Sequence, residues 1–512
     1  MKKWIFVLVV IVVSEVSWSQ NKINLIKLRN DVVQGRCESV IPTLFDISYE
    51  NKNKYSADDI FQTRQMLGVC FFKMGLYHAA AFPLIGNSYQ AKPELALKAV
   101  DLLLRITDKV SDPTLLSYTV NKLDSNLKTQ LSEDLVSSKM GEYKLAQGQL
   151  LEAEEFFKKV LEKSKDNKSA LYQLGLVYLK TNKLKQAYGL FEQLDQLQAN
   201  SKETSYEKGV VSLALARTLY QAKMWTESID AYKVIPRNHE LYRQALFEMA
   251  WAQFRSMKFR AAAGTMETLQ SDFYTHVFDP ESLLLRMTIQ LFICQFEDLQ
   301  NSMKVYEGQY MGTSTLIQQW LVKKPTTKEI YSVILDTIKR KKMISLGYDV
   351  ELKSSVPYFV LRTGLDSVYV KPVLSILDNL KKEKQTFRKL KIAKNQRLSR
   401  FVERIYKNRV SSANARLVEG FLKYLDVTKT NVEQYNKQFD FIKYEYLNAK
   451  RVNIKLQSGL SEEEKKKLNI NPQRDFYWEN GYRYWPFQGE SWVDEVGNYQ
   501  FVGTNRCLND QN

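Results

Sequence analysis

The sequence is poor in the residues on which most catalytic and metal sites depend. Among 512 residues there are three histidines and four cysteines, and none of them lies in an H-E-x-x-H or C-x-x-C arrangement. A zinc site, a histidine-based active site and a thioredoxin-like redox motif are therefore not indicated. No glycine-rich phosphate loop, G-x-S-x-G elbow or dinucleotide fingerprint occurs either. We accordingly expect a chain without catalytic activity, cofactor or bound metal.

Proline and glycine, the residues that interrupt regular structure, are also scarce, at eleven and twenty in the whole chain. Scarce breakers favour long helices over many short strands. We therefore predict an all-α protein.

The cysteines are widely spaced, and the sequence leaves their pairing open. They are Cys37, Cys70, Cys294 and Cys507. An oxidising compartment would permit disulfides among them, and four cysteines allow three fully paired connectivities. The sequence neither selects one of these nor excludes free buried thiols.

The N-terminus has the layout of a secretory signal peptide. Lys2 and Lys3 precede an apolar run from Trp4 to Val13, and a polar stretch follows with serines at positions 17 and 19. About ten apolar residues are too few to cross a membrane as a helix, which takes roughly 20. We expect residues 1–19 to be a signal peptide cleaved before Gln20, with a retained anchor as the alternative. No cysteine stands at the cleavage point, so lipid attachment there is not expected.

A repeat with a fixed spacing is the strongest pattern in the chain that follows. Gly141, Ala153 and Phe157 recur 34 residues later as Gly175, Ala187 and Phe191. A 34-residue period is typical of the tetratricopeptide repeat, a pair of antiparallel helices. Small residues are expected where the two helices cross closely, and large ones where the pair packs against its neighbours.

Weaker copies of this pattern lie on both sides of the two clearest repeats. We expect five to seven helical hairpins between about residues 23 and 310, and hence a tetratricopeptide-like solenoid over residues 20–310. An ordinary helical domain with the same core positions is the alternative. In such a solenoid the first helices line a concave groove, which characteristically receives a peptide, a helix or a partner subunit.

A basic helical segment is predicted over residues 311–470. Residues 321–470 hold 33 Lys or Arg side chains against 16 Asp or Glu. We expect one amphipathic helix through residues 381–409 and a second through residues 413–452, packed antiparallel as a long helical hairpin or coiled coil. The candidate binding residues on the basic outer side of this segment are Arg388, Lys391 and Arg397.

Three interpretations of that basic side stay open at this point. It is a solvated surface without a ligand, or it contacts anionic lipid, glycan or an acidic partner, or it binds nucleic acid. Nucleic acid is the least expected of the three, because an exported protein seldom meets it.

The last segment, residues 471–512, is predicted to be a short, irregular, aromatic-rich tail. Its candidate partner-binding residues are Trp485, Phe487, Glu490, Trp492, Asp494 and Glu495. The aromatic residues form either a clamp that folds back on the preceding helices or a surface for a partner or a carbohydrate. The carboxylates beside stacking aromatics also suit a glycosidase, although such groups more often cap backbone amides or pair with arginines.

Two stretches carry a resemblance to a known family. From Trp485 to Tyr499 the chain reads W-P-F-x-G-E-x-W-x-D-E-V-G-x-Y, and Pro280 and Glu281 begin a P-E-x-x-L segment that leads to Cys294. Both resemble exported tetratricopeptide proteins of the adventurous gliding-motility type.

The resemblance implies a periplasmic or outer-membrane-associated scaffold, part of an envelope-spanning machine in gliding or predatory Gram-negative bacteria. Its partners would be other envelope proteins. A cell-wall or glycan-acting enzyme that uses the C-terminal carboxylates and an assembly chaperone for outer-membrane proteins are the alternative functions.

Overall fold

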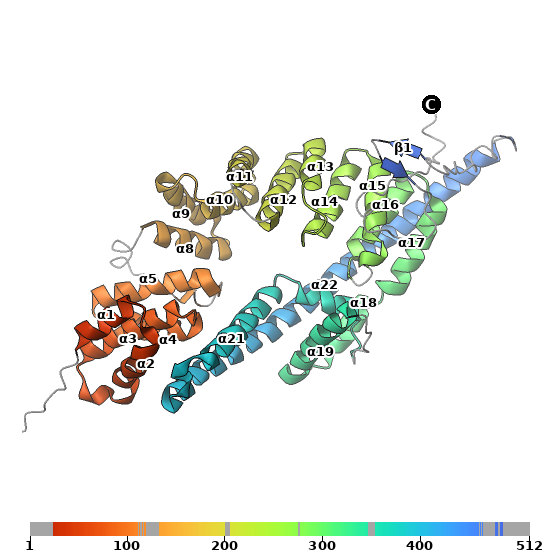
Figure 1. The fold of residues 1–512 in the computed structure, drawn as a ribbon. Coiled ribbons are helices and arrows are strands. Elements are labelled where there is room, and N and C mark those ends of the chain that lie inside the picture. Colours follow the sequence, from red (N-terminus) through yellow and green to blue (C-terminus); the bar gives the residue numbers. More distant parts are fainter. Residues whose placement is uncertain are drawn as a thin grey trace, which may run out of the picture. The chain divides into compact units, whose positions relative to one another are not determined.

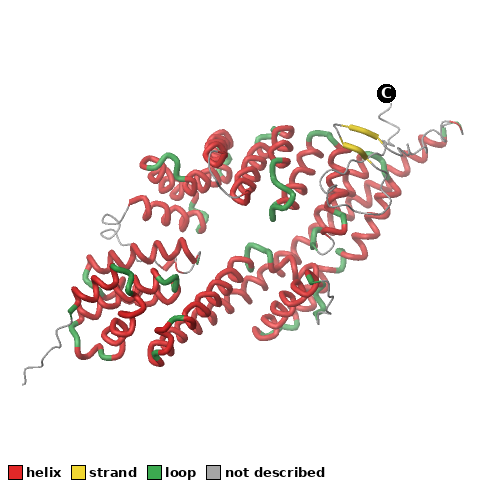
Figure 2. The backbone as a smooth tube through the Cα atoms, in the orientation of Figure 1, coloured by secondary structure: helices red, strands yellow, loops and turns green. Residues whose placement is uncertain are grey.

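The structure is a computed structural model. It describes residues 24–110, 133–199, 205–274, 277–346 and 354–459, six single positions (112, 115, 117, 118, 461 and 463), and strand residues 477–479 and 482–484. Helices make up most of these residues (Figures 1 and 2), so the predicted all-α class is confirmed. Two short strands, β1 (Tyr477–Glu479) and β2 (Tyr482–Tyr484), pair antiparallel. The predictions on residues 1–19 lie outside the described residues.

The chain divides into two compact units. The first consists of residues 1–131 and 378–410, and the second of residues 132–377 and 411–512. The boundaries expected after residues 310 and 470 were placed where the sequence pattern changes, not where compact units meet. They stay predictions.

The described part of the first unit begins with helices packed in succession. They are α1 (Leu25–Val33), α2 (Cys37–Phe45), α3 (Ala57–Lys73), α4 (Tyr77–Gln90) and α5 (Pro93–Val110), with a π-helical turn η1 (Asp46–Glu50) and a 3-10 turn η2 (Lys52–Lys54) before α3. Three later elements complete it: the end of α21 (Lys371–Lys389), the 3-10 turn η4 (Lys391–Lys394) and the start of α22 (Gln396–Ser458).

The second unit contains a row of hairpins, each packed against the next along the chain (Figure 1). The helices are α8 (Glu133–Ala146), α9 (Leu150–Lys163), α10 (Lys168–Lys180), α11 (Leu184–Ala199), α12 (Ser205–Gln221), α13 (Trp225–Lys233), α14 (Tyr242–Arg255), α15 (Phe259–Leu269), α16 (Pro280–Phe292) and α17 (Phe296–Gln309). After them come α18 (Thr313–Val322), α19 (Thr327–Ser345) and α20 (Tyr358–Leu365), and the 3-10 turn η3 (Asp272–Tyr274) follows α15.

The second part of α22 packs on the end of this row. Phe439 stacks on Tyr306 of α17 with ring centroids 4.6 Å apart, and Tyr435 donates a hydrogen bond to Glu281 of α16 at 3.1 Å. Further along, Phe421 and Leu425 join a buried cluster with α18, α19 and α20. The long helix therefore closes the hydrophobic core of the last hairpin.

Seven hairpins in the described residues share one turn geometry. In the α10–α11 turn, Asn182 has a φ of 58°, and Lys183 N donates to Tyr178 O at 2.8 Å while Asn182 N donates to Leu179 O at 3.2 Å. This pair of bonds is the Schellman motif that ends a helix with a left-handed residue. The left-handed position is held in chain order by Gly35, Gly75, Gly148, Asn182, Lys223, Met257 and Cys294. The seven hairpins agree with the expected five to seven.

The repeated glycines allow the two helices of a hairpin to touch. A Cβ on Gly175 would lie 2.6 Å from the ring of Phe191, and one on Gly141 would lie 2.7 Å from the ring of Phe157. Both phenylalanines are fully buried. The expectation that these positions are small because the helices cross closely is confirmed.

Replacing Gly175 with alanine should therefore destabilise the second unit by about 1–3 kcal/mol, the usual cost of overpacking. Gly189 is the matched control, because it is helical with nothing within 4 Å of the added carbon. There the same change should be neutral or stabilising by up to about 1 kcal/mol. Urea unfolding followed by circular dichroism measures both. Equal effects at the two positions would contradict the close contact, and adding Phe191→Leu should recover part of the loss in Gly175→Ala.

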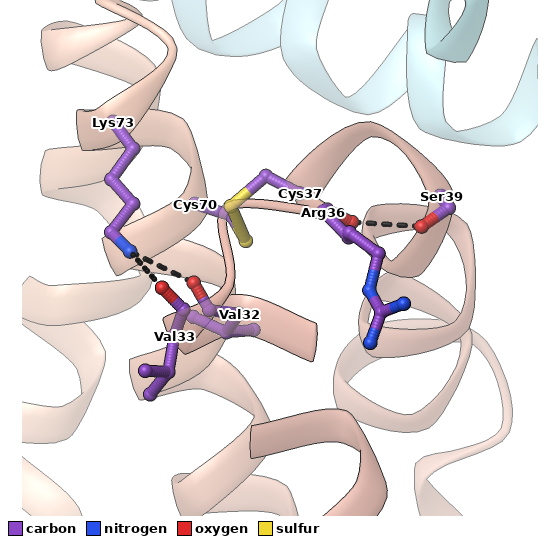
Figure 3. The surroundings of a disulfide bond; sticks show 7 residues. All are labelled: Val32, Val33, Arg36, Cys37, Ser39, Cys70 and Lys73. Carbon is purple, nitrogen blue, oxygen red and sulfur yellow. Dashed lines mark hydrogen bonds between the residues drawn. A yellow bond between two sulfur atoms is a disulfide. The ribbon is translucent and has the colours of Figure 1, made fainter. Parts of the chain in front are cut away.

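A disulfide ties the first hairpin to the second. Cys37, the first residue of α2, is bonded to Cys70 of α3, and both are buried (Figure 3). Beside it, Lys73 Nζ donates to Val32 O at 2.8 Å and to Val33 O at 3.3 Å. None of the described cysteines is free, and Cys507 lies outside the described residues.

The long hairpin is present, but its turn lies elsewhere than expected. The predicted continuous helix over residues 381–409 is wrong, because α21 ends at Lys389 and α22 begins at Gln396. Asn395 explains the new start, since its side-chain oxygen accepts from Arg397 N and Leu398 N at 3.1 Å each. The predicted break before residue 413 is absent, because residues 410–415 contain no proline or glycine and α22 runs through them.

Candidate functional site

The surface best suited to a partner is an aromatic cluster on α14, α15 and α16 of the second unit. Its members are Trp251, Phe254, Phe259 and Phe292. The ring centroid of Phe254 lies 6.1 Å from that of Trp251, 5.6 Å from that of Phe259 and 5.3 Å from that of Phe292. Phe259 and Phe292 stack at 5.6 Å. Three consecutive helices thus contribute to one group of touching rings.

The aromatic cluster is only half-covered. Phe292 is 50% exposed, and the other three rings are half-buried on the core of the preceding hairpins. Arg255 lies over the Trp251 ring at 5.9 Å, and Met257 beside it is 69% exposed. Aromatic rings with methionine and arginine at their edge are enriched at protein interfaces.

The repeat places these rings. Phe254 is the penultimate residue of α14 and Phe259 the first of α15, on opposite sides of the turn at Met257. The preceding hairpin has the same pair, Tyr220 and Trp225, with centroids 5.0 Å apart. Thirty-four residues separate Tyr220 from Phe254. The pattern is therefore present in the sequence, but the prediction of the repeat rested on small residues at the helix crossing and did not include these large residues at the turn.

A half-buried charge network links α12, α13 and α14. Glu248 of α14 accepts from Arg217 of α12 at 2.6 and 2.8 Å and from the hydroxyl of Tyr232 at 3.0 Å. Burial, and then the charge of Glu248, raise the pKa of Tyr232 well above its usual value. The hydroxyl therefore stays protonated and donates. Because the network spans α12, α13 and α14, it fixes their spacing.

The three predicted basic residues lie on the hairpin of residues 378–410, and two of them form ion pairs. Arg388 pairs with Glu403 and Arg397 with Glu50, each at 3.0 Å. Lys391 donates its backbone N–H to Glu38 at 2.5 Å while its side chain is exposed. The predicted residues Trp485, Phe487, Glu490, Trp492, Asp494 and Glu495 lie outside the described residues.

The first unit has a buried cluster of titratable groups, formed by His78, Glu383 and Tyr406, and its role is structural. Glu383 of α21 accepts from the backbone N–H groups of His78 and Ala79 at 2.9 and 3.1 Å, at the start of α4. Its carboxylate also contacts His78 Nδ1 at 2.8 Å and accepts from the Tyr406 hydroxyl at 3.1 Å. Burial, and then the charge of Glu383, raise the pKa of Tyr406 far above its usual value. Glu383 therefore caps α4 from a distant part of the sequence.

The described residues contain neither a candidate membrane-spanning helix nor a group of side chains suited to a metal ion. No helix among them is both long and apolar enough to cross a membrane. No three His, Cys, Asp or Glu side chains in the described ranges are grouped so that they could hold a metal ion.

Comparison with known proteins identifies the repeat. Residues 144–204 match the tetratricopeptide-repeat family model, and no curated protein matches the chain. Among solved structures, a tetratricopeptide repeat protein from Parabacteroides merdae is similar at 15% identity and a TM-score of 0.25, over 56% of this chain and 91% of that one.

Two further solved structures are similar at lower identity. A Rap protein in complex with competence and sporulation factor matches at 12% identity and a TM-score of 0.29, over 77% of this chain and 98% of that one. The apo form of RapI matches at 10% identity and a TM-score of 0.32, over 72% of this chain and 97% of that one. The chain therefore contains tetratricopeptide repeats at residues 144–204, and the expected helical-repeat fold is confirmed.

Proposed function

We propose that this protein is a scaffold that binds an apolar segment of a partner protein across the aromatic cluster. The observation that supports the proposal is the group of touching, half-covered rings that α14, α15 and α16 present together. Interface energy concentrates in such anchors, because a partner removes a large apolar area from water with little loss of side-chain freedom. The hydrogen bonds that Glu248 accepts from Arg217 and Tyr232 tie α14, which carries two of the rings, to α12 and α13, and a preformed binding surface needs helices that are held in place.

We further propose that the scaffold works in the periplasm, as a component of an envelope-spanning machine of the motility type. The N-terminal pattern of residues 1–19 and the resemblance of residues 485–499 support this proposal. The Cys37–Cys70 disulfide supports the location as well, because disulfides persist in oxidising compartments outside the cytoplasm.

A photoreactive amino acid at position 292 tests the scaffold proposal. Phe273 gives the matched control, since it is a phenylalanine of the same unit and is 46% exposed against 50% for Phe292. In living cells, position 292 should crosslink to a small, reproducible set of envelope proteins, and position 273 should not. Phe292→Ala should weaken the binding of the captured partner roughly 30-fold, as expected for the loss of an interface anchor.

Two outcomes would contradict the scaffold. Equal crosslinking from both positions would show that the aromatic cluster has no special role. A broad set of unrelated outer-membrane proteins captured at position 292 would indicate a chaperone instead.

A further inference from the structure

The positive charge of the first unit is concentrated in one hairpin. Residues 378–410 hold twelve Lys or Arg side chains against three Asp or Glu, whereas residues 24–110 of the same unit hold eleven against nine. The N-terminal hairpins are therefore close to neutral. Residues 378–410 therefore carry most of the net positive charge among these residues.

Six of these cations form a continuous surface, which we call the cationic face. On α21 the row is Lys381, Lys384 and Arg388, and on α22 it is Arg400, Arg404 and Lys407. Spacings of three and four residues place the members of each row on one side of a helix. The buried residues of α22, which include Leu398, Val402 and Ile405, lie on the opposite side.

One carboxylate joins the two rows and shows that they lie together. Glu403 of α22 accepts from Lys384 at 2.7 Å and from Arg388 at 3.0 Å, both on α21. Burial alone would raise the pKa of Glu403, but the hydrogen bonds from Lys384 and Arg388 outweigh it and hold the pKa below the usual range. The cationic face already binds one anionic group.

The remaining charges are available to a ligand. Lys381, Arg404 and Lys407 are exposed, and none has an ion-pair partner among the described residues. Arg400 is exposed too and donates only to the backbone oxygen of Gln396, at 3.3 Å. One acid side chain cannot neutralise six cations, so the face keeps a strong positive potential.

We propose that the cationic face binds the surface of a membrane that contains anionic phospholipids. No large apolar side chain of residues 378–410, all of which the structure describes, is exposed. A protein partner would need an apolar centre for its interface. Lipid headgroups need only matching charge, and each Lys or Arg near such a surface strengthens binding. The two rows also lie side by side on adjacent helices. Their charges can therefore contact several headgroups of one membrane surface at the same time.

Vesicle binding by the chain from Gln20 to Asn512, which contains every described residue, tests the proposal. The chain should sediment with vesicles of phosphatidylglycerol and phosphatidylethanolamine, but not with phosphatidylcholine vesicles, and should be released by about 0.5 M salt. Neutralising Arg400→Gln, Arg404→Gln and Lys407→Gln together should weaken binding roughly a hundredfold. The control changes Lys27, Lys52 and Lys54 to Gln, which removes the same charge from exposed positions of the first unit. It should leave binding within about twofold.

Three results would overturn the proposal. They are no binding to anionic vesicles, an equal loss in both triple variants, or tight binding to a soluble polyglutamate but not to vesicles. The last result would assign the face to an acidic protein. The inference stands apart from the scaffold proposal, because Phe292→Ala should bind vesicles like the unchanged chain.

Discussion

Replacing Glu383 with alanine should lower the stability of the first unit by about 4 kcal/mol. The carboxylate is buried and receives four hydrogen-bonding groups, from the backbone of His78 and Ala79, the His78 ring and the Tyr406 hydroxyl. Alanine would leave these groups buried without an acceptor, and the start of α4 has no side-chain cap of its own. Hydrogen exchange of residues 76–90, with urea unfolding of the whole chain, measures the loss.

Two variants separate this effect from a general loss of charge. Glu383→Gln keeps one oxygen that can accept from the two backbone N–H groups, so it should recover part of the stability. Asp378→Ala removes a 57% exposed carboxylate of the same helix, whose partner is Lys382 at 2.5 Å. That change should cost about 0.5 kcal/mol or less, as exposed pairs do. If Asp378→Ala and Glu383→Ala were equally harmful, the capping role of Glu383 would be wrong.

Removing the Cys37–Cys70 disulfide should cost about 3–4 kcal/mol. The bond closes a segment with a sequence separation of 33 residues, and a link of that length restricts the unfolded chain by about this amount. The double variant Cys37→Ala with Cys70→Ala keeps small apolar side chains at both buried positions, so it isolates the crosslink. Thermal and urea unfolding should both shift, and hydrogen exchange should rise first in α1 and α2.

The single variants supply the control for this experiment. Cys37→Ala and Cys70→Ala each leave one thiol, which should become reactive toward a maleimide in urea and stay unreactive in the folded state, because both positions are buried. A double variant within about 0.5 kcal/mol of the unchanged chain would show that the disulfide adds no stability, against the chain-entropy expectation.

Local patterns of the chain predicted the repeat fold well. The pairs Gly141 with Phe157 and Gly175 with Phe191 identified both the helices and their crossing, because a close approach needs a missing side chain at one fixed position. The same kind of pattern could have placed the turn of the long hairpin. Asn395 is a typical residue for the start of a helix. The amphipathic spacing continues past it, however, and by itself predicts an unbroken helix.

Contacts between distant segments could not be predicted in this way. Glu383 accepts from His78, which lies 305 residues earlier in the chain, and the local sequence around either residue does not predict the contact. The aromatic cluster could be predicted only in part. The pair of Phe254 and Phe259 follows from the repeat, whereas their contact with Phe292 depends on how α16 packs beside α15.

The division of the chain has a consequence for the order of events during synthesis. The N-terminal hairpins leave the ribosome first, yet residues 378–410 belong to their compact unit, and the acceptor for the start of α4 is Glu383. The first unit therefore cannot close until most of the chain has been made. Pairings over so long a separation form slowly. The earliest segment to emerge is thus among the last to be finished, and it stays open while the repeats behind it are being translated.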